Sequence, residues 1–169
     1  MLRLQQEIEE NRRAASNIIR LGVIETASAT TVDVQTGANH AKRIPFFVYY
    51  AGGVSRYRRP SVGEQCVLLN LGSGDNLNNA VALTGLPSDQ FPSPTTDANQ
   101  VMTDYGNGMS EVYDLAKGQL KAVYPGGLFV DGDIEASGEV SDHTRSMQED
   151  RDIYNSHHHG DSPTPNESQ

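Results

Sequence analysis

The strongest constraint in this 169-residue sequence is a strict alternation of side chains between residues 128 and 140. Every even position carries an apolar or small residue, whereas the odd positions, apart from Phe129 and Ser137, are acidic. Because successive side chains of a strand point to opposite faces, this period-two pattern predicts an extended ribbon. One face of that ribbon would be apolar and the other acidic.

A ribbon of this length has too few residues to bury its own apolar face. Three copies wrapped around a common axis would bury it, and Gly132, Ala136 and Gly138 suit a crowded, tapering interior. The acidic outer face would then discourage pairing with strands of other proteins. One amphipathic hairpin on a globular sheet fits the pattern equally well, so both arrangements remain open at this point.

The composition of the chain favours association with other copies and disfavours nucleic acid. Hydrophobic residues make up only 36% of the chain, so some segments are either disordered or buried against other copies. The formal net charge of -9 argues against nucleic acid as a partner, because phosphate contacts need clustered Lys and Arg. We interpret Arg56, Arg58 and Arg59 as a solvated or subunit-contacting loop, with RNA contact as the alternative.

No segment has the pattern of a membrane span or a signal peptide. No stretch approaches the roughly 18 apolar residues that a membrane helix needs. Residues Met1 to Arg13 are mostly charged and polar, rather than charged and then apolar. We therefore expect synthesis and folding in a bacterial cytoplasm, with release only as part of a larger assembly.

Residues 20–86 contain five short β-rich runs separated by glycine-containing turns, which predicts a small closed barrel such as an OB-fold. The runs cover residues 23–24, 31–36, 44–50, 67–71 and 80–83. Cys66 stands alone in an apolar run, so we interpret it as a buried hydrophobic residue rather than a nucleophile. Gly72–Ser73–Gly74 lacks the spacing of a phosphate loop, so we interpret it as a hairpin turn.

The other segments complete a mainly β chain. A thin apolar stripe of Leu4, Ile8, Ala15 and Ile18 predicts a helix at 2–19 that docks against a neighbour. Asp142 is expected to cap a short helix that runs toward Tyr154. We divide the chain into an N-terminal helix at 1–19, a barrel at 20–86, a linker at 87–101, a β-ribbon at 102–141 and a tip with a polar tail at 142–169.

Three of the five histidines stand together at positions 157–159. Residues i and i+2 of an extended segment point the same way, so His157 and His159 can address one metal ion while His158 points away. Imidazole is a good ligand for Fe, Ni, Cu and Zn. Three such pairs on a three-fold axis would form an octahedral set and pin the chain ends. A solvated tail and an expression tag are the alternatives; His40 and His143 are interpreted as structural or solvated.

Four passages together resemble the baseplate assembly protein V family, the central spike of contractile-tailed phages and R-type pyocin-like particles. They are the helix leading into residues 18–24, the Pro-Ser-x-Gly-Glu-Gln signature within 59–65, the alternating ribbon, and residues 146–160 with the family's His-x-His-Gly ending. The passages span nearly the whole chain in the family's order. The middle His158 is often another residue in the family, and the tail after Gly160 is somewhat long.

The resemblance implies a homotrimer. Its N-terminal OB-fold would dock onto the tail hub and baseplate proteins, and an intertwined triangular β-helix would follow. At the tip, the His157 and His159 side chains of all three chains would bind one iron ion through six imidazoles; zinc or nickel are possible instead. Located in the virion tail baseplate or a pyocin-like particle, the spike would help baseplate assembly and pierce the target's outer membrane when the sheath contracts.

We expect no enzymatic activity. The sequence contains no recognisable pairing of a nucleophile with a base, and no carboxylate pair that calls for catalysis. One alternative is a cell-wall-degrading tail module, but no unassigned segment is large enough to hold a lysozyme domain. The other alternative is a metal-dependent binding or hydrolytic module, which would need an open coordination position at the histidine site.

Overall fold

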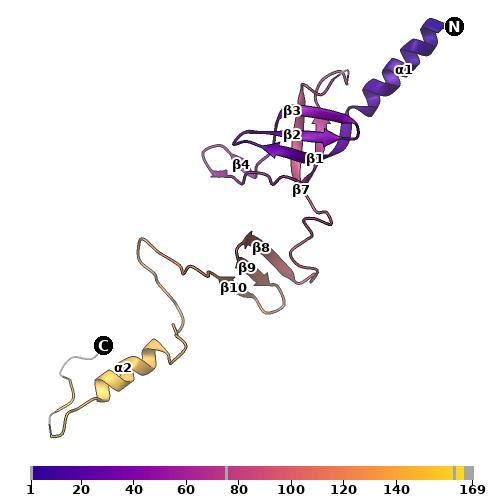
Figure 1. Ribbon diagram of the computed structural model, residues 1–169. Coiled ribbons are helices and arrows are strands. Elements are labelled where there is room, and N and C mark those ends of the chain that lie inside the picture. The colour runs from indigo at the N-terminus through magenta and orange to yellow at the C-terminus, as the bar shows by residue number, and fades with distance from the viewer. Residues whose placement is uncertain (1, 75, 162, 166–169) are drawn as a thin grey trace. The chain divides into compact units, whose positions relative to one another are not determined.

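The computed structural model describes residues 2–74, 76–161 and 163–165. Within these residues the chain is mainly β, with one helix near each end (Figure 1). The chain divides into two units, residues 1–106 with 110–122 and residues 107–109 with 123–169. No described helix is both long enough and apolar enough to cross a membrane. Of the expected polar tail, residues 162 and 166–169 lie outside the described part of the chain.

The first helix, α1 (Leu2–Ser16), is shorter than the predicted 2–19. It ends because Asn17 leaves the helical pattern: its N–H bonds to the Ala14 carbonyl at 3.1 Å, three residues back. The Asn17 side chain donates to the Gly74 carbonyl at 2.8 Å and accepts a hydrogen bond from Arg20 at 2.7 Å. These contacts turn the chain into a strand at Ile19, so the Ile18 and Ile19 side chains do not extend the helical stripe.

Five strands form an antiparallel sheet in the order β3-β2-β1-β6-β7. Their bounds are β1 Ile19–Ala27, β2 Thr31–Thr36, β3 Asn39–Pro45, β6 Gln65–Asn70 and β7 Ala80–Leu86. The two edges of the sheet meet at a parallel bridge between Phe46 and Ala82, where the Phe47 N–H donates to the Ala82 carbonyl at 3.0 Å. The sheet therefore closes into a small barrel. The short strands β4 (Tyr50–Ala51) and β5 (Ser55–Arg56) form a separate ribbon.

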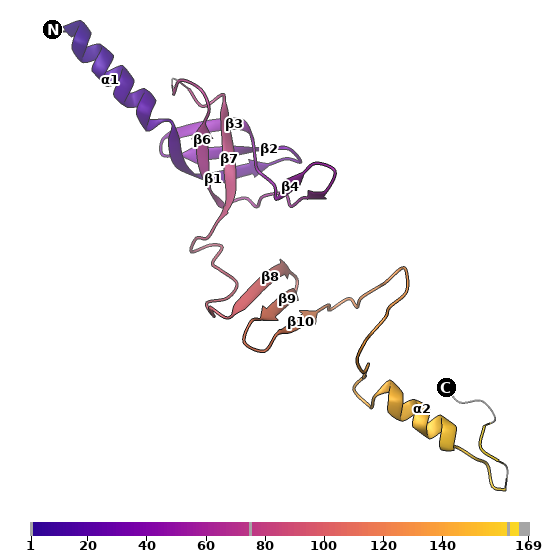
Figure 2. The same ribbon diagram turned by 180° about the vertical axis from the view of Figure 1, so that it is seen from behind.

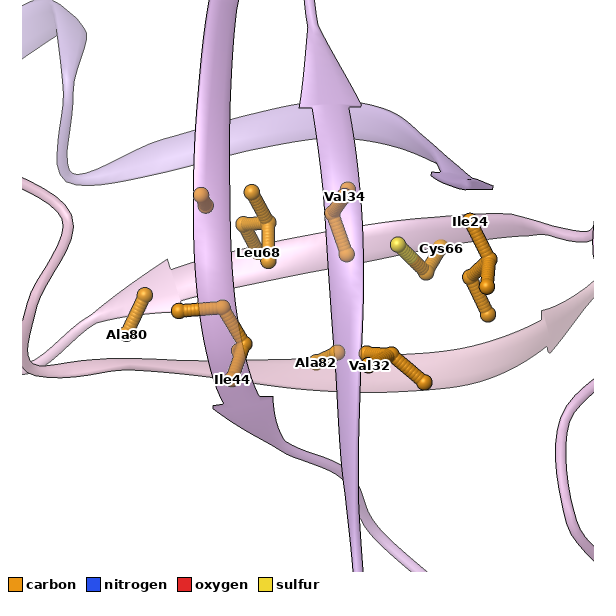
Figure 3. Close-up of a cluster of buried hydrophobic side chains, with 9 residues drawn as sticks. Ile24, Val32, Val34, Ile44, Cys66, Leu68, Ala80 and Ala82 are labelled. Carbon is orange, nitrogen blue, oxygen red and sulfur yellow. The ribbon is translucent and has the colours of Figure 1, made fainter. Parts of the chain in front are cut away.

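The interior of the barrel is filled by one cluster of side chains, drawn in Figure 3. Alternate residues of the strands point inward, as the period of a strand requires. The cluster consists of Ile24, Val32, Val34, Ala41, Ile44, Cys66, Leu68, Ala80 and Ala82. The interpretation of Cys66 as a buried hydrophobic residue is confirmed, since its side chain is fully buried and burial raises the pKa of its thiol to about 11.

The third strand of the barrel lies earlier in the chain than predicted. The sequence favoured the apolar run 44–50, whereas the structure places β3 at Asn39–Pro45. Gly37 adopts a φ of 61°, which lets the chain reverse in a tight turn and pair directly with β2. A β-bulge at Arg43, whose φ is 54°, breaks the alternation between the buried Ala41 and Ile44 and so hides the strand from a period-two pattern.

The side-chain carboxylate of Asp33 holds this bulge in place. It accepts the Arg43 N–H at 2.8 Å and lies 3.3 Å from the Lys42 ammonium. The backbone hydrogen bond from Arg43, with a further contribution from Lys42, lowers the pKa of Asp33. Residues 72–74 lie in the connection of the antiparallel β6–β7 hairpin and are not followed by a helix, as predicted (Figure 2).

A three-stranded sheet with the order β10-β9-β8 follows the barrel. Its strands are β8 Gln100–Gly106, β9 Met109–Asp114 and β10 Gln119–Val123. After β10, residues 125–145 are all exposed, and residues 128–140 belong to no strand of their own chain. The alternative of an amphipathic hairpin on a globular sheet is therefore not what the single chain forms. The predicted apolar face lies open along its whole length.

Candidate metal centre

The candidate site follows directly on helix α2 (Met147–Ser156). The expectation that Asp142 caps this helix was wrong, because the N-cap is Ser146. The Ser146 hydroxyl accepts the Glu149 N–H at 3.2 Å, and the Glu149 carboxylate accepts the Ser146 N–H at 2.7 Å. This reciprocal pair is a capping box. Asp142 instead accepts the N–H groups of Thr144 and Arg145, which forms a turn ahead of the helix.

The helix ends at Ser156, and His157 adopts extended backbone angles of -67° and 134°. The change from helix to extended chain makes side chains two residues apart point the same way. The Nε2 atoms of His157 and His159 lie 2.7 Å apart, with ring centroids 4.3 Å apart and planes at 87°. The remaining histidine of the run, His158, has its Nδ1 atom 3.2 Å from the Gly160 carbonyl. The structure thus brings together the predicted pair and directs His158 elsewhere.

The geometry of the pair fits two ligands of one metal ion. Imidazole nitrogens bind a transition metal at about 2.0–2.1 Å, so two adjacent octahedral ligands lie about 3 Å from each other. The observed separation of 2.7 Å is close to this value. The same separation also suits a hydrogen bond in which one ring donates and the other accepts. Either a proton or a metal ion can therefore join the two nitrogens.

One chain supplies only part of a ligand set. Within the described residues there is no group of three or more His, Cys, Asp or Glu side chains arranged to hold a metal ion. The pair is exposed to solvent, so its free coordination directions are open to further ligands from outside the chain. A complete site requires donors that another copy, another protein or water would provide.

The remaining histidines lie on the surface, and two arginines of the basic cluster contact nearby side chains. His40 lies 2.9 Å from the Glu25 carboxylate on the barrel surface, and His143 is exposed. The guanidinium of Arg56 lies 5.5 Å from the centre of the Tyr49 ring. Arg58 forms an ion pair with Glu64 at 2.7 Å, which gives that residue of the cluster a role in the fold.

Glu64 is a residue whose role the sequence did not reveal, although it stands in the Pro-Ser-x-Gly-Glu-Gln signature. Its carboxylate is nearly buried and accepts four hydrogen bonds. The donors are the Arg58 guanidinium at 2.7 and 3.0 Å, the Ser61 N–H at 3.0 Å and the Gly85 N–H at 2.8 Å. The signature therefore ties the loop before β6 to the end of β7. The sequence does not reveal that the Glu64 carboxylate is buried, because its hydrogen-bond donors come together only in the folded barrel.

The fold and the site define a β-rich protein whose N-terminal part is a closed barrel and whose C-terminal part carries an open alternating ribbon and a histidine pair. No protein-family model matches the chain. The chain is 34% identical over 136 residues to the spike protein of Escherichia phage P2, a match that covers 79% of this chain and 62% of the relative. This match supports the phage baseplate spike family that the four sequence passages indicated.

Proposed function

We propose that three copies of this chain form the central spike of a contractile phage tail or a related pyocin-like particle. The relative from phage P2 is named a spike protein, and it supports a place in the tail baseplate. In this proposal the spike helps the baseplate assemble and pierces the target's outer membrane when the sheath contracts. The chain spans about three fifths of its relative, at 62%, so these roles are proposed for the shared part.

The observation that carries the proposal is the exposed apolar face between residues 128 and 140. Four large apolar side chains on this face are exposed in the single chain: Leu128, Val130, Ile134 and Val140. Ile134 alone is 75% exposed. Burying four such side chains contributes up to about 6–12 kcal/mol per chain. Three ribbons around one axis would gain this stabilisation and keep the acidic face toward solvent.

The barrel is proposed to be the OB-fold of the spike, the part that docks onto the tail hub. Two observations support this assignment. The strand order β3-β2-β1-β6-β7 closes through a parallel contact between the residues after β3 and strand β7. A five-stranded Greek-key barrel with this closure is the architecture of the OB-fold.

The proposed tip site holds one iron ion, with zinc or nickel as chemically reasonable substitutes. His157 and His159 of each chain would supply two nitrogens, and three chains would supply six. When bound, the ion would cross-link three chain ends, and its binding energy would add to the stability of the tip. Because six imidazoles leave no open position for a substrate or water, this site is proposed to be structural rather than catalytic.

Native mass spectrometry of the purified full chain tests trimer and metal together. We expect three chains and one transition-metal ion in the wild-type protein. The variant His157→Ala/His159→Ala should keep three chains and lose the ion, because the ribbon holds the trimer and the histidines hold the metal. The variant His158→Ala is the matched control and should keep both. A metal-free monomer of the wild-type protein would disprove the proposed spike, and a double variant with full metal content would disprove the ligand assignment.

A further inference from the structure

A second apolar surface lies on the outside of the barrel, over strands β1, β6 and β7. It is formed by the residues that alternate with the core: Ile19, Leu21, Val67, Leu69, Val81 and Leu83. They are neighbours across the strands, since Leu69 pairs with both Ile19 and Val81, and Val67 with both Leu21 and Leu83. We name these six residues the outer aliphatic face.

The outer aliphatic face is unusual for the surface of this chain. Ile19 is 65% and Leu21 is 67% exposed, and the other four side chains are partly exposed. None of the six is charged, although the chain as a whole has a formal net charge of -9. A contiguous aliphatic patch on a sheet, bordered by polar residues such as Gln35 and Gln65, is typical of a surface that another element covers. Its lack of charge lets another copy of this acidic chain approach without repulsion.

Helix α1 presents the complementary surface. Every side chain from Arg3 to Arg13 is exposed, and the apolar stripe includes Leu4 at 61% and Ile8 at 55%. A helix with one apolar stripe is stabilised by packing that stripe on another element. The 15 residues of α1 extend about 22 Å, and a helix is about 10 Å wide. Three neighbouring strands span about 10 Å, so the helix and the face match in width.

The two surfaces cannot meet within one chain. Only Asn17 and Ile18 separate α1 from β1. The Asn17 side chain fixes this short link to the Gly74 carbonyl and to Arg20. The last turn of the helix lies directly against the β6–β7 connection: a Cβ atom on Gly74 would come within 2.2 Å of the Ala14 carbonyl oxygen. Folding α1 back over the outer aliphatic face of its own barrel would break these contacts.

We propose that α1 of each chain packs its apolar stripe on the outer aliphatic face of the next chain. This inference rests on the proposed trimer. Away from a three-fold axis, a contact between neighbouring chains joins two different surfaces, so each chain needs two surfaces that fit each other. The helix stripe and the outer aliphatic face are such a pair, and three identical contacts close a ring. The barrels, and not only the ribbons, then hold the trimer together.

Cross-linking of the full-length protein tests the exchange of helices. The variant Ile8→Cys/Leu21→Cys places one thiol on the stripe and one on the face, and Cys66 is buried and remains unreactive. With a short bis-maleimide reagent we expect a covalent trimer on a denaturing gel. The control Glu10→Cys/Leu21→Cys should give roughly tenfold less cross-linking, because residues 8 and 10 lie on opposite sides of a helix.

The mass of the untreated variant, measured by light scattering, separates this inference from the proposed function. A trimer that yields no covalent trimer, or yields only chains cross-linked to themselves, would overturn the exchange and leave the spike proposal standing. A monomer would overturn both. Equal cross-linking in the Glu10 control would also overturn the exchange, because it would reflect non-specific contact of a mobile helix.

Discussion

At the scale of single residues, Glu64 illustrates how a charged side chain is kept inside a small barrel. Burial raises the pKa of its carboxyl group, but hydrogen bonds from Arg58, Ser61 and Gly85 more than offset burial. The pKa therefore lies below the ordinary value of 4.5. The hydrogen bonds from Arg58 lower this pKa most, followed by the bond from the Ser61 N–H. Arg58 is 59% exposed, so water screens part of its contribution to stability.

Replacing Glu64 with Gln should destabilise the barrel by about 2 kcal/mol at pH 7, because charge-assisted hydrogen bonds are lost and an amide NH₂ meets N–H donors. Urea denaturation monitored by circular dichroism measures the difference. A carboxyl group with a lowered folded-state pKa stabilises the fold above the unfolded pKa, and this stabilisation is lost as pH falls. The difference between wild type and Glu64→Gln should therefore shrink below pH 4.5.

The exposed Glu10 provides the control for this prediction. The variant Glu10→Gln should unfold at nearly the same urea concentration as the wild type, because surface charges contribute little. A Glu64→Gln variant that matched this control at pH 7 would contradict the structural role of the signature carboxylate.

At the scale of elements, local hydrogen bonds decide where helices and strands begin. The N-cap of helix α2 is Ser146 rather than Asp142. Only Ser146 has a Glu three residues later, and the carboxylate of that Glu accepts the N–H of the N-cap residue. Strand β3 begins just after the Gly37 turn, and Asp33 stabilises the bulge within it. In both cases a side chain that satisfies backbone N–H groups outweighs the hydrophobic pattern.

Removing the helix cap by Ser146→Ala should destabilise α2 by about 1 kcal/mol. Hydrogen exchange of the amides between residues 149 and 154 should accelerate by roughly fivefold, which corresponds to this free energy. The variant Ser156→Ala is a matched control at the other end of the helix, where the hydroxyl bonds back to the carbonyls of Asp152 at 2.8 Å and Ile153 at 3.2 Å. Faster exchange in Asp142→Ala to the same extent as in Ser146→Ala would contradict the assigned cap.

At the scale of the whole molecule, the described residues leave several apolar surfaces exposed in the single chain, among them the stripe of α1, the outer aliphatic face of the barrel, and the even positions of the ribbon. In the proposed trimer, these surfaces would give a chain with only 36% hydrophobic residues enough apolar area to bury. On its own, a single chain buries only the core of its barrel among the described residues. The remaining apolar area is available for contacts between copies, and such contacts stabilise the folded state by mass action.

The proposed three-fold arrangement of the ribbon predicts opposite results for two neighbouring substitutions. Ile134→Lys would bring three ammonium groups together at the axis, where burial of unpaired charge is strongly unfavourable. We expect loss of the trimer or a large decrease in its thermal stability. Glu135→Lys, on the acidic face, should leave the trimer intact. Size-exclusion chromatography with light scattering distinguishes these outcomes, and a stable Ile134→Lys trimer would refute the buried face.

Much of this protein is determined by its sequence alone, because the deciding interactions are local or periodic. The i, i+2 spacing of His157 and His159 is enough to place both rings together. The ribbon between residues 128 and 140 stays a prediction, because these residues form no strand in the single chain. The burial of Cys66 and the presence of a small barrel follow from short β-rich runs and glycine turns. Period and spacing can be read directly from the order of the residues, so features that depend on them can be predicted without knowledge of the tertiary contacts.

Other features depend on contacts between residues far apart in the chain, and only the tertiary structure decides them. The end of α1 depends on a hydrogen bond from Asn17 to Gly74, 57 residues away. The burial of Glu64 depends on an N–H group from β7, and the position of β3 depends on a bulge held from β2. No pattern in the sequence encodes these distances, because they exist only once the barrel has closed.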